Sequence, residues 1–166
     1  MKTTVIGALA ALAVAACGAA GVVLGAAPAG AAPTNPCKML KKSEIQQAFG
    51  GTVSSGRKGI GTPVSAQCEF EVGANGARPA GTLTVHVMTT GAKAAYTGLK
   101  KTSQYVSIAG VPNALYAEKV HVVDVLQGDV LVGVQGGFVI TDPLPIHFFD
   151  DKTHLTDLAQ IAARRV

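Results

Sequence analysis

The order of apolar and polar residues along this chain predicts most of its strands. Residues 67–72, 82–89 and 130–135 alternate between the two kinds, and a period of two is the pattern of a strand with one buried face. Three other runs predict further strands at 52–57, 114–118 and 120–127. In the first two alternating runs, the residues expected to face the core are Cys68, Phe70, Val72, Leu83, Val85 and Val87.

Helical spacing of apolar residues predicts three helices. The first spans 43–49, with Ser43 as N-cap and Gln46 as its partner in a capping box, and it ends at a pair of glycines. The second spans 91–101 and is amphipathic, and the third begins near Asp151. The apolar residues that the third helix is expected to bury are Leu155, Leu158, Ala159 and Ala162.

Short connections between the predicted strands determine the fold class. Gly128 and Asp129 form a two-residue hairpin turn, and the segment 73–81 contains the turn pair Asn75-Gly76. Consecutive strands joined by short turns pair antiparallel, with helices segregated to one face. We therefore expect a single α+β domain over residues 36–166, with a mostly antiparallel sheet and helices packed on one face.

An apolar, uncharged run over residues 3–32 precedes this domain and predicts export. Lys2 supplies the charged end of a secretory signal peptide. In one reading, residues 14–17 form a lipobox and Cys17 becomes the acylated mature N-terminus; in another, a signal peptidase cleaves after Ala31. An uncleaved membrane anchor is a third reading, because the run is long enough to span a bilayer. Residues 18–35 are then an Ala/Gly/Pro-rich tether or the remainder of the signal.

The net charge is mild and indicates no nucleic-acid partner. Without Lys2, 13 basic and 10 acidic residues give +3. The chain lacks the Arg-rich or aromatic–basic pattern of nucleic-acid binders. Membrane contact is expected through a lipid on Cys17, near a small lysine cluster that we interpret as a solvated helix start: Lys38, Lys41 and Lys42.

Two cysteines remain in the predicted domain, Cys37 and Cys68. An exported protein meets an oxidising compartment, where two such cysteines pair. Two cysteines without paired histidines make a poor zinc site, so a structural disulfide is the favoured interpretation.

The sequence contains no recognisable catalytic motif, and we expect no metal and no cofactor. The nucleophile-elbow pattern Gly-x-Ser-x-Gly is missing. The densest group of titratable residues is His147, Asp150, Asp151 and His154, which would have to converge to form an acid–base or metal site. A polar loop with a helix N-cap explains the same residues, and we favour it.

An apolar segment interrupted by Pro143 and Pro145 is the best candidate for an interaction surface. If the prolines hold its side chains outward, they form a patch for an apolar ligand or a protein partner. An edge strand beneath the last helix is the simpler interpretation. The candidate binding residues are Phe138, Ile140, Leu144, Ile146, Phe148 and Phe149.

Several short motifs, taken in order, resemble a family of exported actinobacterial proteins and lipoproteins. They are Asn35-Pro36-Cys37, a helix ending at Phe49-Gly50, Cys68-Glu69-Phe70, the segment 108–116 and Gly128-Asp129. The chain resembles domain-of-unknown-function family 3558 over most of residues 35–165. Pro112-Asn113 and Leu115 depart from that pattern. The resemblance implies an exported domain and carries over no catalytic residue.

These observations predict an exported cell-envelope protein that is a non-enzymatic binding or accessory lipoprotein. It is expected either on the outer face of the membrane, as a lipoprotein, or in secreted form. Its expected partner is an envelope protein or an apolar ligand. The alternative is a small secreted hydrolase with an acid–base site near His147, Asp151 and His154.

Overall fold

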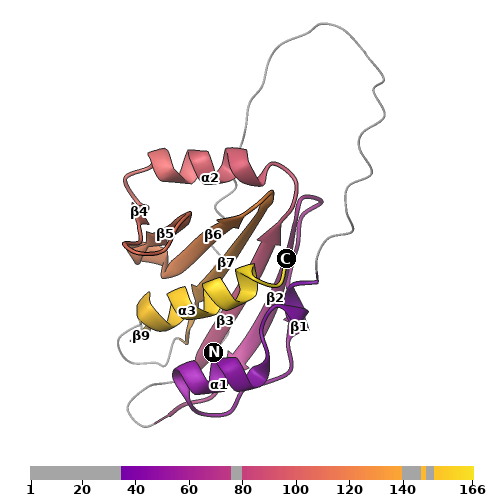
Figure 1. Ribbon diagram of the computed structural model, residues 1–166. Helices are drawn as coiled ribbons and strands as arrows, with labels where there is room; N and C mark the ends of the chain where they lie inside the picture. The colour runs from indigo at the N-terminus through magenta and orange to yellow at the C-terminus, as the bar shows by residue number, and fades with distance from the viewer. Residues whose placement is uncertain (1–34, 76–79, 140–146, 149–151) are drawn as a thin grey trace, which may run out of the picture.

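A seven-stranded antiparallel sheet forms the centre of the fold (Figure 1). The computed structural model describes residues 35–75, 80–139, 147–148 and 152–166. In spatial order, the strands are β1 (Arg57–Lys58), β2 (Ser65–Val72), β3 (Gly81–Met88), β7 (Val130–Gly136), β6 (Val122–Gln127), β5 (Ala114–Ala117) and β4 (Val106–Ser107). The expected α+β class with a mostly antiparallel sheet is confirmed.

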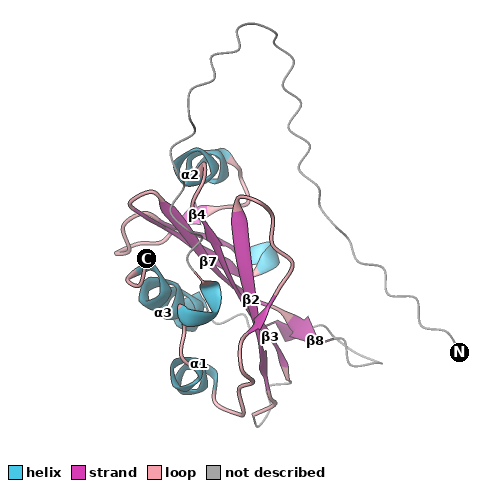
Figure 2. Cartoon of the chain, turned by 90° about the vertical axis from the view of Figure 1, so that its right-hand side faces the viewer, coloured by secondary structure: helices cyan, strands magenta, loops and turns pink. Residues whose placement is uncertain are grey.

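Two helices, α1 (Lys42–Phe49) and α3 (Lys152–Ala163), lie on the same side of the sheet (Figure 2). The third, α2 (Ala92–Lys101), lies at the end of the sheet where β6 turns into β7, and its Lys93 forms an ion pair with Asp129. The short 3-10 helices are η1 (Pro36–Lys38) and η2 (Glu118–Val120). A separate two-stranded sheet joins β8 (Phe138–Val139) to β9 (His147–Phe148).

Strand register places one row of buried residues under α1 and α3. Pairing aligns Cys68, Val85, Val134, Val123 and Tyr116 across five strands, and all five are buried. Burial of apolar side chains is the main favourable term in folding, so this core face supplies most of the stability. The helix residues that pack against it are Ile45, Phe49, Leu155, Leu158, Ala159 and Ala162, which confirms the buried face expected for the last helix.

The first helix begins earlier than the sequence predicted. The N-cap is Lys41, and its backbone N–H donates to Glu44 Oε2 at 2.8 Å. Ser43 lies inside the helix, so the proposed capping box of Ser43 with Gln46 is wrong. Glu44 stands three residues after Lys41 and satisfies the free backbone donor, which is the role that the prediction gave to Gln46.

Two predicted strands are displaced, and one strand was not predicted. Instead of 52–57, the edge strand β1 covers 57–58, and Val53 makes only an isolated bridge to Val72. Residues 118–120 form η2, so β6 begins at Val122 rather than Val120. The strand β4 has two residues, too few to produce a visible alternation.

The end of α3 is tied to the beginning of the fold by Arg165. Its guanidinium donates to Glu44 Oε2 at 2.8 Å and to the Met39 carbonyl oxygen at 2.6 Å. The Arg165 guanidinium lowers the pKa of the Glu44 carboxyl, against the opposing effect of burial. The ion pair thus closes the core face at its rim, between residues 121 positions apart in sequence.

Candidate functional site

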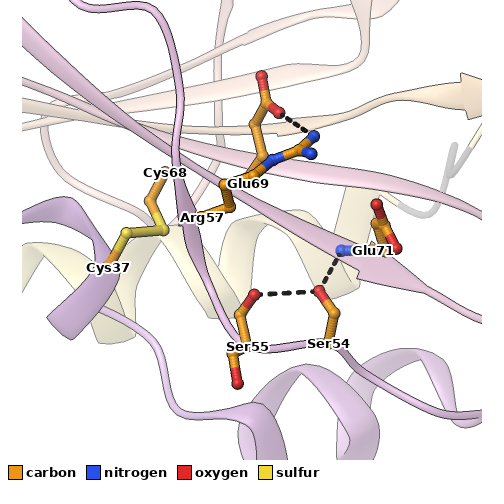
Figure 3. Close-up of polar contacts among 7 residues, drawn as sticks. All are labelled: Cys37, Ser54, Ser55, Arg57, Cys68, Glu69 and Glu71. Carbon is orange, nitrogen blue, oxygen red and sulfur yellow. Dashed lines mark hydrogen bonds and ion pairs between the residues drawn. A yellow bond between two sulfur atoms is a disulfide. The ribbon is translucent and has the colours of Figure 1, made fainter.

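The predicted disulfide is present and joins η1 to the sheet (Figure 3). Cys37 and Cys68 are bonded, with their Cα atoms 5.1 Å apart, and Cys68 is fully buried. Gly56 lies directly against this bridge, because a Cβ there would stand 2.6 Å from Cys68 Sγ. A disulfide of this kind is compatible with an exported protein.

Polar contacts beside the disulfide fasten the segment before β1 onto β2 (Figure 3). The Ser54 hydroxyl accepts the backbone N–H of Glu71 at 2.9 Å, and the Arg57 guanidinium lies 3.2 Å from Glu69 Oε2. The Arg57 side chain is largely exposed, so this ion pair contributes little stability. These contacts are structural and bring together no reactive group.

Part of the apolar segment proposed as a binding surface forms the hairpin of β8 and β9. Phe138 pairs with Phe148, and Val139 pairs with His147. The other candidate residues, Ile140, Leu144, Ile146 and Phe149, lie outside the described residues. Their binding role stays a prediction.

The proposed acid–base cluster is described only in part. His154 lies on α3, with its ring packed edge-on against Phe49 at 5.8 Å between centroids. Asp151 lies outside the described residues, and His147 is described only as a backbone position in β9. Convergence of His147, Asp151 and His154 therefore stays a prediction.

A different polar cluster lies on the face of the sheet opposite the core. The register aligns His86, Gly133 and Asp124 across β3, β7 and β6, in the row next to the buried one. His86 Nε2 lies 2.8 Å from Asp124 Oδ1, and because a carboxylate only accepts, the imidazole N–H donates. Asp124 is only 2% exposed, whereas the His86 side chain is 25% exposed.

Gly133 makes this contact possible. A Cβ there would lie 1.9 Å from His86 Nε2 and 2.4 Å from Asp124 Oδ1, so any side chain would occupy the space where the two groups meet. No local pattern in the sequence predicts this pair, since His86 and Asp124 stand 38 positions apart. Only the register across an intervening glycine brings them together.

Tyr105 lies in the connection between α2 and β4. Burial, followed by the charge of Asp124, raises the pKa of Tyr105 to about 12. Among the described residues, no hydroxyl or thiol is hydrogen-bonded to His86, so the cluster is an oriented histidine without a joined nucleophile.

A pocket of about 530 Å³ opens on the core side of the β4–β5 edge, beside the first turn of α3. Tyr116 is its buried residue, and Lys152 Nζ lies 5.2 Å from the centroid of the Tyr116 ring. The lining residues are Ser103, Gln104, Val106, Tyr116, Glu118, Lys119 and Lys152. Sequence reasoning missed this pocket, because its residues come from five separate elements and connections.

Within residues 35–75, 80–139, 147–148 and 152–166, no three His, Cys, Asp or Glu residues form a group able to hold a metal ion. None of the helices described there is long and apolar enough to cross a membrane.

Comparison with known proteins adds no relative. No family model, curated protein or solved structure matches this chain. The similarity to domain-of-unknown-function family 3558 stays a prediction from sequence motifs.

Proposed function

We propose that this chain is an exported cell-envelope protein that acts by binding, as an accessory lipoprotein anchored through Cys17. The observation that carries the proposal is the Cys37–Cys68 disulfide, which lies just after the apolar N-terminal run. Disulfides persist in oxidising compartments and are rare where thiols are kept reduced. The apolar run, the lipobox at 14–17 and the disulfide therefore support the same location.

A binding role fits the polar cluster better than a hydrolytic one. His86 is oriented by a buried carboxylate, but within the described residues it has no serine, threonine or cysteine partner. The apolar segment that contains Phe138 and Phe148 remains the candidate surface for an envelope partner or an apolar ligand. Alanine substitution of both phenylalanines should abolish capture of that partner, and unchanged capture would remove the segment from the proposal.

The intact mass of the mature protein from its native host tests the location. A species that starts at Cys17 and carries added acyl mass is the expected result. A species that starts at Ala32, lighter by the two hydrogens of one disulfide, would replace the lipoprotein with a secreted protein. A chain that keeps residues 1–16 and has free thiols at Cys37 and Cys68 would overturn export altogether.

A further inference from the structure

The pocket at the β4–β5 edge has the size and the chemistry of a small-molecule site. Its volume of about 530 Å³ lies within the range typical of ligand pockets, roughly 300–1,000 Å³. Val106 and the Tyr116 ring supply apolar surface, and Ser103 and Gln104 supply a hydroxyl and an amide. Such a lining accommodates a ligand with both an apolar body and a polar group.

The charges of the pocket favour an anion. Lys119 and Lys152 each contribute an ammonium group, against the single carboxylate of Glu118. Among the described residues, neither lysine forms an ion pair. Lys152 lies near the Tyr116 ring and so places a positive charge beside an aromatic surface. A ligand with a sulfonate, carboxylate or phosphate attached to an apolar group can contact both the charge and the ring.

We infer that the pocket lined by Tyr116, Lys119 and Lys152 binds a small organic anion with an apolar body. The inference goes beyond the proposed function, whose candidate surface is the segment that contains Phe138 and Phe148.

Binding of 8-anilinonaphthalene-1-sulfonate to the mature protein tests the pocket. Its neutral analogue, N-phenyl-1-naphthylamine, has the same rings without the sulfonate. The double variant Lys119→Gln/Lys152→Gln should lose about fivefold to tenfold in affinity for the sulfonate and keep its affinity for the neutral probe. Lys100→Gln/Lys101→Gln removes the same charge from the end of α2 and should leave both affinities unchanged.

Equal affinities of the two double variants for the sulfonate would overturn the pocket assignment. This result would leave export intact, because export is decided by the mass of the mature chain. If the mass of the mature chain instead contradicts the lipoprotein, the probe titration still tests the pocket independently.

Discussion

The two faces of the sheet are built from adjacent rows of the same strands but are held together by different forces. On the core face, the row from Cys68 to Tyr116 is buried beneath α1 and α3 and is joined to η1 by a disulfide. On the opposite face, the next row contains His86, Gly133 and Asp124, and a directed hydrogen bond joins His86 to Asp124 across the glycine. On β3 and β6, a shift of one residue along the strand leads from the buried apolar row to this polar pair.

This difference separates stability from orientation. Apolar contacts are non-directional and tolerate exchange of similar side chains, so the core face specifies that the sheet forms. Hydrogen bonds between buried groups require defined distances and angles, so the opposite face specifies where particular atoms lie.

Removal of the disulfide should have the largest effect and should act on the core face. Replacement of Cys37 and Cys68 by alanine opens a loop with a sequence separation of 31 residues. The chain-entropy estimate gives a loss of about 3–4 kcal/mol in the free energy of unfolding, measurable by urea denaturation. A loss below about 1 kcal/mol would mean that packing alone holds η1 on the sheet.

Substitution of Gly133 should break the opposite face. In Gly133→Ala, the new Cβ displaces His86 from Asp124, and we expect a loss of about 2–3 kcal/mol in the free energy of unfolding. Gly98→Ala is the matched control, because nothing lies within 4 Å of a Cβ at that helical position. The free energy of unfolding of the control should rise by about 0.5–1 kcal/mol. If this free energy changed in the same direction in both variants, the tight contact at Gly133 would be contradicted.

Substitution of Arg165 should have a smaller effect at the rim of the core face. Arg165→Met removes the hydrogen bonds to Glu44 and to the Met39 carbonyl, and partial exposure limits the expected loss to about 1–2 kcal/mol. The pKa of Glu44 is lowered in the folded state, so its contribution is present above the ordinary value of 4.5 and is lost as the pH falls through the folded value. Denaturation curves of the wild type and Arg165→Met should therefore converge at acidic pH, and a constant difference between them would contradict the ion pair.

The smallest effect should be an alkaline titration step on the opposite face. The pKa of Tyr105 is raised from 10.0 to about 12, so the folded state keeps a proton that the unfolded state releases. The stability that Tyr105 contributes is present below pH 10 and falls as the pH rises toward 12. Absorbance of tyrosinate should show one late step in the wild type, absent in Tyr105→Phe and earlier in Asp124→Asn. A late step that survives in Tyr105→Phe would assign it to another tyrosine.

The sequence predicted the core face well because a strict period of two is a local property. The buried side of Leu83, Val85 and Val87 followed from adjacent residues, and the pairing of Cys37 with Cys68 followed from their number and the expected compartment. The opposite face was not predictable in this way. A single histidine and a single aspartate in separate strands give no periodic signal, and Gly133 acquires its role only when the register is known.

The short elements could not be predicted from the sequence for a similar reason. A strand of two residues such as β4 is formed by its pairing with β5 and leaves no pattern of its own. The turn at η2 ends with His121 in a left-handed backbone conformation, with φ of 47°, which residues other than glycine adopt rarely. The pocket is built from such segments, so its existence required the three-dimensional structure.

The position of the disulfide also determines how the fold would carry a mechanical load. A pull on the chain before Cys37 passes through the sulfur bridge directly into β2, the second strand of the sheet. The residues between the two cysteines, including all of α1 and β1, lie within the covalent loop and bear no tension. A pull from the N-terminal side would therefore load the sheet before it loads the first helix, which keeps its hydrogen bonds.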